Sequence, residues 1–221
     1  MTDAHHDHHT HEDLVLDEAF WDERYGSKED IWSGQVNPQL LAEAMDLASG
    51  TALDAGCGEG ADALWLAGRG WQVTAVDISS IPLQRGAAHA AELGSEIAER
   101  ITWQHADLGV TAPPEASYDL VAAHFLQLRE DDRRRLYSAL AAAVAPGGTL
   151  LIVGHHPTDM LTGVPRPPEP ELFFTAEELA AELPRDGWEV VVADRRERTV
   201  QDPDGHEVTI ADAVLRARRA G

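Results

Sequence analysis

Apolar and polar positions along the chain form blocks that predict strands and helices in turn. Short apolar runs, such as 51–57 (TALDAGC) and 71–79 (WQVTAVDIS), predict buried strands. Between such runs lie stretches with helical spacing of apolar residues and capping residues at their starts. We expect further strands at 101–108, 118–128 and 148–156, and helices at about 60–67, 80–94, 131–144 and 175–183.

The two ends of the chain depart from this alternation. Residues 1–16 are polar and rich in histidine, which predicts a mobile tail. Residues 17–49 predict two helices, the second with Asn37 as its N-cap and Gly50 after its end. At the other end, segment 188–219 predicts an antiparallel hairpin, because two strand-like runs flank the turn QDPDGH.

This order of elements predicts an α/β fold with a doubly wound, mostly parallel sheet, helices on both faces and an antiparallel C-terminal hairpin. Five βα units precede the hairpin. The length of 221 residues and the hydrophobic content of 43% suit one such domain. We expect that domain over 17–221, with 17–49 as an N-terminal helical cap and the proline-rich segment 157–174 as a lid loop.

Composition narrows the class of protein. The formal net charge of −22 argues against nucleic acid and anionic membranes as partners. Cys57 is the only cysteine, so no intrachain disulfide can form. No apolar run is long enough to span a membrane, and the N-terminus lacks the pattern of a signal peptide. These features predict a cytoplasmic protein. The basic runs 195–201 (RRERTVQ) and 133–135 predict a solvated strand edge and a solvated helix face.

A glycine-rich turn follows the first predicted strand. Gly56, Gly58 and Gly60 occupy alternate positions between that strand and the next helix. Glycine lets backbone approach a ligand where side chains would clash, and ligands of doubly wound sheets bind at the carboxyl ends of the strands. The turn therefore predicts a nucleotide-like ligand.

Three aspartates at predicted strand ends strengthen this prediction. Asp54 lies inside the first strand and could bind an ammonium group. Asp77 ends the second strand, where a carboxylate can accept hydrogen bonds from both ribose hydroxyls. Asp107 is expected to end the third strand, where it could accept a hydrogen bond from an adenine amino group.

Two alternatives stay open. The spacing of Gly56, Gly58 and Ala61 also fits the fingerprint of NAD-dependent oxidoreductases, although Asp54, Gly60 and the terminal hairpin favour a smaller ligand. A non-catalytic cofactor- or metal-binding protein is the other alternative. Its metal ligands would be the tail imidazoles, which we interpret as a solvated tail; HExxH and CxxC motifs are lacking, so no catalytic metal site is expected. The tail histidines are His5, His6, His8, His9 and His11.

The motifs together resemble the class I S-adenosylmethionine-dependent methyltransferases. The resemblance covers about residues 17–219 and rests on LDAGCGEG (53–60), VTAVDIS (73–79), ADL (106–108) and APGGTLLI (145–152). The segment FWDERYGSKEDIWSGQVNPQLL resembles, more loosely, the tellurite-resistance and thiopurine-type small-molecule subgroup. The family implies a Rossmann-like seven-stranded sheet of order 3-2-1-4-5-7-6, and methyl transfer from S-adenosylmethionine to a small-molecule acceptor.

The resemblance also implies roles for individual residues. His124, at the end of the fourth strand, would lie beside the methyl group as the catalytic residue. Trp21, His155 and His156 are candidates for contact with the acceptor. The residues implied to bind the cofactor are Asp54, Gly56, Cys57, Gly58, Gly60, Asp77, Ile78, Asp107, Leu108, Tyr25 and Trp32.

The acceptor must approach the methyl group from the side opposite the leaving sulfur. Segments 20–35 and 158–174 are free to cover that side, and the second contains Met160, Leu161 and Val164. We expect a mixed aromatic and aliphatic pocket for a small, mostly uncharged acceptor. Whether oxygen, nitrogen, sulfur or a metalloid is methylated stays open; a hydroxyl or amine would need a base such as His124. Oligomeric state is also open.

Overall fold

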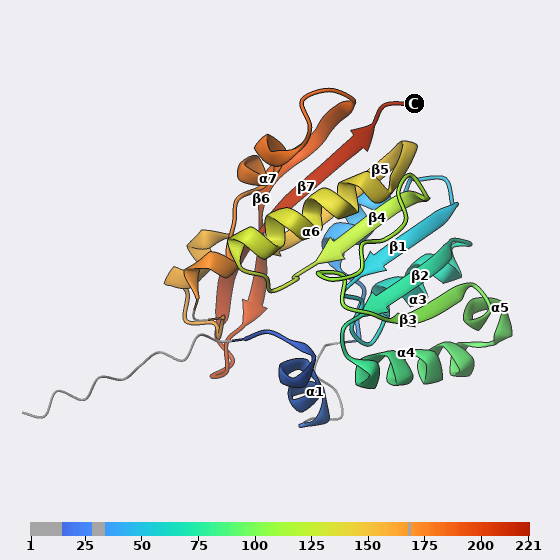
Figure 1. Cartoon of the computed structure of the whole chain (residues 1–221). Coiled ribbons are helices and arrows are strands. Elements are labelled where there is room, and N and C mark those ends of the chain that lie inside the picture. Colours follow the sequence, from blue (N-terminus) through green and yellow to red (C-terminus); the bar gives the residue numbers. More distant parts are fainter. Residues whose placement is uncertain (1–14, 28–33, 168) are drawn as a thin grey trace, which may run out of the picture.

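The computed structural model describes residues 15–27, 34–167 and 169–221, and seven strands of these residues form one sheet (Figure 1). The strand order is β3-β2-β1-β4-β5-β7-β6, which confirms the expected topology. β1 to β5 are parallel, and β7 runs antiparallel to both β5 and β6. The strands are β1 (Thr51–Ala55), β2 (Gln72–Asp77), β3 (Ile101–His105), β4 (Tyr118–His124), β5 (Val144–His155), β6 (Trp188–Gln201) and β7 (Glu207–Arg219).

Helices cover both faces of the sheet. Residues of α6 and α7 pack with one set of inward-pointing strand residues, and residues of α2 and α3 pack with the other set; Figure 1 shows α6 crossing the sheet on one face. The helices are α1 (Glu18–Gly26), α2 (Pro38–Ala44), α3 (Ala61–Gly68), α4 (Ser80–Leu93), α5 (Ser95–Ala98), α6 (Glu130–Ala143) and α7 (Ala176–Glu182), with two 3₁₀ helices, η1 (Pro157–Leu161) and η2 (Pro170–Leu172).

Local capping follows the sequence signals. The Asn37 side chain accepts a hydrogen bond from the Gln39 N–H at 2.9 Å, as an N-cap does. Thr175 and Glu178 form the reciprocal capping box of α7. α2, however, ends at Ala44, earlier than the expected end beside Gly50.

Two strand boundaries differ from expectation. β5 begins at Val144, directly after α6, although the sequence predicted a break at Pro146 and Gly147. Pro146 stops a helix because it lacks an N–H, but it is compatible with extended backbone, and Gly147 turns with a φ of +80° within the strand. β3 ends at His105, and no helix separates it from β4 among the described residues, so the expected five βα units are four.

The segment 157–174 packs closely onto the domain. Asp159 is 1% exposed and Phe174 is also buried, whereas Met160 and Leu161 are 45% and 89% exposed. The segment exposes these two aliphatic residues and buries a carboxylate and aromatic rings, and the part of Met160 and Leu161 in an acceptor pocket stays a prediction. Its role as a lid stays a prediction. Within the described part of the chain, no helix has both the length and the apolar character needed to cross a bilayer.

Candidate active site

The glycine turn after β1 adopts left-handed backbone at each glycine, with φ of +70° at Gly56, +53° at Gly58 and +80° at Gly60. The turn is tied to β2: the Gly58 N–H donates to Asp77 Oδ2 at 2.8 Å, and the Ser79 N–H donates to Oδ1 at 2.9 Å. Asp77 thus shapes the turn from the end of β2. Burial raises the pKa of Asp77, and these N–H groups oppose the rise.

The first and last glycines serve close packing as well as turning. A Cβ on Gly56 would lie 2.1 Å from Leu126, which follows β4, and one on Gly60 would lie 2.2 Å from the Trp103 ring. With contacts this short, a side chain at either position would require Leu126 or the Trp103 ring to move. Close packing thus accounts for glycine at both positions, and the contact of Gly60 with a cofactor stays a prediction.

Asp54 is a buried carboxylate without a full set of partners. It is 2% exposed, and its Oδ2 atom has no hydrogen bond among the described residues. Burial and the negative charge of Asp62 raise the pKa of Asp54 to about 7. A carboxylate held this way stabilises a cation placed beside it, because a cation would relieve its desolvation.

His124 and Asp62 form a dyad beside Asp54. His124 Nδ1 lies 2.7 Å from Asp62 Oδ2, and the two side chains are 6% and 14% exposed. Asp62 is oriented in turn by the Asn37 N–H, 2.7 Å from Oδ1. The other ring nitrogen, His124 Nε2, is buried and has no hydrogen bond among the described residues. An imidazole oriented by a carboxylate, with its second nitrogen free, is the arrangement of a general base.

The pKa of His124 depends on the neighbouring carboxylates of Asp62 and Asp54. Burial lowers the pKa of His124, but the hydrogen bond and charge of Asp62, with the charge of Asp54, raise it overall above its ordinary value. Sequence reasoning missed Asp62. A possible signal was its place in the first helical turn after the glycine loop, where an acid is favoured by the helix dipole.

The backbone after the dyad is strained. Phe125 has a φ of +53°, a region that side chains other than glycine rarely adopt. Its ring packs 4.7 Å from the His155 ring, centre to centre. Strain of this kind persists where surrounding packing enforces it and is common at functional sites.

Helix α1 lies at the ends of β2 and β3. Asp22 accepts a hydrogen bond from Ser79 Oγ at 2.6 Å, and the Tyr25 carbonyl accepts one from Arg85 at 2.9 Å. Tyr25 is buried, and its ring centre lies 6.1 Å from that of Trp21. Trp21 packs within α1, and its contact with the acceptor stays a prediction. Trp32 lies outside the described residues.

The expected adenine residues lie beyond β3. Asp107 is exposed, two residues after the strand ends, so the expectation that it closes the strand is wrong. Its Oδ1 accepts a hydrogen bond from the Gly109 N–H at 2.7 Å, which forms a tight turn. Leu108 is partly buried against the core, and the Ile78 carbonyl lies 2.9 Å from His105 Nε2.

Cys57 is half-buried, and burial raises the pKa of its thiol well above the ordinary value.

Comparison with known proteins shows which family this part of the chain resembles. Residues 52–148 match the family model described as a methyltransferase domain. This part of the chain is similar to methyltransferase domains. The match begins in β1 and ends in β5, so it includes the glycine turn, Asp77 and the dyad of Asp62 and His124.

Relatives in sequence carry methyltransferase names. An uncharacterized methyltransferase of Mycobacterium tuberculosis is 36% identical over 123 residues, which are 55% of this chain and 59% of the relative. The ubiquinone biosynthesis O-methyltransferase of Serratia proteamaculans is 34% identical over 120 residues, 52% of this chain and 48% of that protein. The chain thus spans between about half and three-fifths of the length of these curated relatives.

Solved structures are similar to this chain in fold over most of its length. A protein from a study of disulfide-to-thioacetal conversion in echinomycin biosynthesis matches with a TM-score of 0.71 and 24% identity, covering 92% of this chain and 91% of its own. The glycopeptide N-methyltransferase MtfA complexed with S-adenosyl-L-methionine matches with a TM-score of 0.63 and 18% identity, covering 87% and 90%. The resemblance to the tellurite-resistance subgroup stays a prediction.

The two histidines after β5 differ in their surroundings within the methyltransferase fold. His155 packs between the rings of Phe125 and Phe173, and its Nδ1 atom is buried without a hydrogen bond among the described residues. Burial, and next the positive charge of Arg166, lower the pKa of His155 to about 4. His156 caps η1 instead, by accepting from the Thr158 N–H, and is half-buried. Of the two, His155 is the better candidate for acceptor contact.

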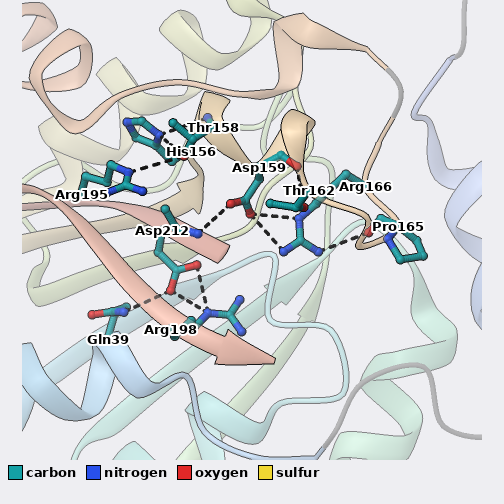
Figure 2. A network of polar contacts seen from close by, with 11 residues as sticks. Gln39, His156, Thr158, Asp159, Thr162, Pro165, Arg166, Arg195, Arg198 and Asp212 are labelled. Atoms are coloured by element: carbon teal, nitrogen blue, oxygen red, sulfur yellow. Dashed lines mark hydrogen bonds and ion pairs between the residues drawn. The ribbon is translucent and has the colours of Figure 1, made fainter. Parts of the chain in front are cut away.

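A polar network that joins η1, β6 and β7 was missed from the sequence (Figure 2). Asp212, 0% exposed, binds Arg198 through both carboxylate oxygens and accepts from Gln39. Asp159 binds Arg166 and accepts from the Ala211 N–H at 2.6 Å. The prediction of a solvated edge at 195–201 is therefore wrong in part. An acid within the apolar run TIADAV was the available signal.

The structure also differs from the expected solvated helix face at 133–135. Arg133 is buried, with its guanidinium 5.1 Å from the centre of the Phe174 ring, so 133–135 is not a uniformly solvated helix face.

Among the described residues, Asp202, Asp204 and His206 could together approach a metal ion. Asp202 already accepts the N–H groups of the other two, so the cluster is explained by the turn of the hairpin.

Proposed function

We propose that this protein transfers the methyl group of S-adenosylmethionine to a hydroxyl group of a small-molecule acceptor. The observation that carries the proposal is the dyad of Asp62 and His124, which lies in a methyltransferase domain next to Asp54 and the glycine turn. A thiolate or selenide acceptor would need little help from a base, whereas a hydroxyl must lose its proton as it attacks. A dyad with a free Nε2 atom supplies that function.

The residues at the ends of β1 and β2 suit this cofactor. The Asp54 carboxylate has a free, buried acceptor atom for an ammonium group. The Asp77 carboxylate is fixed by two backbone N–H groups and retains lone pairs for ribose hydroxyls. Ile78, Asp107 and Leu108 would contact the adenine, with Tyr25 and Trp32 covering the bound molecule. The bound cofactor would supply an electrophilic methyl group and a neutral thioether as leaving group.

The chain's own residues would then manage the proton. His124 Nε2 takes the proton of the acceptor hydroxyl while the oxygen forms its bond to the methyl carbon. The bound cofactor would release its methyl group and keep the electron pair of the carbon–sulfur bond on sulfur, which would leave a methyl ether and S-adenosylhomocysteine. Asp62 keeps the Nδ1–H tautomer and stabilises the imidazolium that forms.

The names of relatives favour oxygen as the methylated atom. One is a ubiquinone biosynthesis O-methyltransferase, and another, 29% identical over 126 residues, is a 2-heptyl-1-hydroxyquinolin-4(1H)-one methyltransferase of Mycobacteroides abscessus. Both names are consistent with an acceptor whose hydroxyl is attached to a ring. The family match also weighs against the NAD-dependent and non-catalytic alternatives.

A labelled-methyl transfer assay tests the proposal. Purified protein is incubated with methyl-labelled S-adenosylmethionine and matched phenols, thiols and amines, with His124→Asn compared against His89→Asn, an exposed control. We expect transfer to phenols, and a loss in kcat of at least about 100-fold in His124→Asn, because general-base catalysis contributes roughly 10²–10⁴-fold. Cofactor affinity should stay unchanged.

Two results would contradict parts of the proposal. Transfer to thiols alone, with equal rates for wild type and His124→Asn, would remove the role of the dyad as a base. Absence of cofactor binding by the folded protein would remove the methyltransferase activity altogether.

A further inference from the structure

Two buried carboxylates hold two arginines next to His155. Asp212 of β7 receives the Arg198 Nε–H at 3.1 and 2.9 Å from its two oxygens, and Asp159 of η1 lies 3.0 Å from Arg166 Nη2. Figure 2 shows Arg198 reaching Asp212 from the side opposite Gln39. We call His155, Arg166 and Arg198 the arginine–histidine cluster.

Arg198 uses only one edge of its guanidinium for this ion pair. Its Nε atom contacts Asp212, while neither of its terminal amino groups makes a hydrogen bond to any described residue. The side chain is 31% exposed, and its guanidinium carbon lies 5.8 Å from the centre of the Phe125 ring. A guanidinium anchored in this way presents two parallel N–H donors, which match the two oxygens of a carboxylate.

The cluster lies on the same face of the sheet as the dyad. His124 pairs with Val153 across β4 and β5, and His155 pairs with Asp212 across β5 and β7. Residues paired in register point to the same face, and positions two apart along a strand do so as well. His124, His155 and Asp212 therefore project from one face, in order along the edge of the sheet. Two strand spacings separate β4 from β7, roughly 10 Å.

The ring surfaces between these groups are aromatic. His155 stacks against Phe125 at 4.7 Å and against Phe173 at 5.9 Å, measured between ring centres. The two nearby guanidiniums, after burial, keep the pKa of His155 low, so the imidazole is neutral at physiological pH and offers a hydrogen bond without charge. A planar ring fits such a wall better than a flexible chain, because it stacks and loses little conformational entropy.

We propose that the acceptor is a small aromatic acid, whose carboxylate binds the free edge of the Arg198 guanidinium while its hydroxyl faces His124. This inference rests on the proposed function and names the class of acceptor. An aromatic ring with a hydroxyl and a carboxylate on opposite sides, together with their hydrogen bonds, spans the separation of β4 and β7. It replaces the expectation of a mostly uncharged acceptor.

Binding measurements on matched probes test this inference. Calorimetry is run with S-adenosylhomocysteine present, using the three hydroxybenzoate isomers and the corresponding hydroxybenzamides, which lack the negative charge. The proteins are wild type, Arg198→Lys and Arg198→Gln, with Arg195→Lys as control, because Arg195 is exposed on the same strand and pairs with Glu197. Thermal unfolding and cofactor affinity establish that each variant is folded.

We expect at least one hydroxybenzoate to bind wild type at least tenfold more tightly than its amide. Arg198→Lys and Arg198→Gln should lose that preference, because neither offers the two parallel donors, while amide binding and cofactor affinity stay unchanged. Arg195→Lys should behave as wild type. The bound hydroxybenzoate should also be methylated at its hydroxyl.

Three results would overturn the inference. Wild type could bind acids and amides equally, bind neither while binding the cofactor, or keep its preference in both Arg198 variants. Each leaves the proposed function standing if another phenol is methylated. A purely structural role of Arg198, limited to neutralising Asp212, predicts the last result together with a lower melting temperature.

Discussion

Single residues decide the chemistry of this site, and three of them are buried acids or their partners. Asp54, Asp62 and His124 lie together at the ends of β1 and β4 and the start of α3, and the charge of Asp62 raises the pKa of both Asp54 and His124. Such clusters are costly in a folded protein, because each charge loses its water. Their presence beside a glycine turn is better explained by ligand binding and proton transfer than by stability.

The Asp62→Asn variant separates the positioning role of Asp62 from mere packing. Asp62 raises the pKa of His124, so its loss should lower that pKa. The base would then be neutral at lower pH, and the acidic limb of the kcat profile should move to lower pH while kcat at the plateau falls. The measurement is a pH–rate profile from about pH 6 to pH 9, with the exposed Asp46→Asn as control. A profile of unchanged position would contradict the dyad.

The Asp54→Asn variant should bind the cofactor less tightly and unfold at a higher temperature than wild type. Burial raises the pKa of Asp54 from 3.8 to about 7, so the folded state binds more protons than the unfolded state between these values. This contribution to stability is present at low pH and is lost as pH rises through about 7. The variant should therefore melt about 2–6 °C above wild type at pH 8.5, given roughly 1–3 kcal/mol for a buried unpaired polar group.

Calorimetric scans across pH, together with cofactor titrations, check this prediction. The difference in melting temperature should shrink towards pH 5.5, where wild-type Asp54 is protonated in the folded state. Cofactor affinity should fall in the variant at pH 7.5. A variant that is less stable than wild type at pH 8.5 would show that the Asp54 carboxylate has a partner in the folded protein.

At the scale of elements, the segment 157–174 and the hairpin of β6 and β7 form one polar unit. Asp159 of η1 accepts the N–H of Ala211 in β7 and binds Arg166, while Asp212 binds Arg198 of β6. These contacts fix the segment against β7, which lies between the strands that carry His155 and Arg198. Within the proline-rich connection, the buried Asp159 carboxylate makes these contacts, whereas Met160 and Leu161 are exposed.

Asp159→Ala tests that unit. The change leaves the Ala211 N–H and the Arg166 guanidinium without their buried acceptor, and breaking a buried ion pair costs roughly 3–5 kcal/mol. We expect melting to fall by about 5–15 °C. The double variant Asp159→Ala with Arg166→Met should recover part of the loss, since it removes the orphaned charge. Thermal unfolding of both, with Met160→Ala as control, measures this; no recovery in the double variant would contradict the coupling.

At the scale of the whole molecule, the sequence predicted most of the fold and part of the site. The alternation of elements predicted the mostly parallel sheet and the hairpin, because local periodicity and turn residues determine them. The strand order was implied by the resemblance to the methyltransferase family. Asp77 lies at the end of β2 as expected. The pairing of His124 with Asp62 could not be predicted, because it joins residues 62 positions apart and depends on how α3 sits against β4. The burial of Asp159 and Asp212 depends likewise on the register of β5 with β7.

The most direct test of the central claim is a calorimetric titration of S-adenosylmethionine into the full-length protein and into Asp77→Asn. The account predicts saturable binding at one site per chain by wild type. It predicts affinity at least about tenfold lower in Asp77→Asn, because a hydrogen bond to a charged group contributes roughly 1.5–3 kcal/mol. Equal affinity in the two proteins, or binding of NAD⁺ in place of S-adenosylmethionine by wild type, would contradict it.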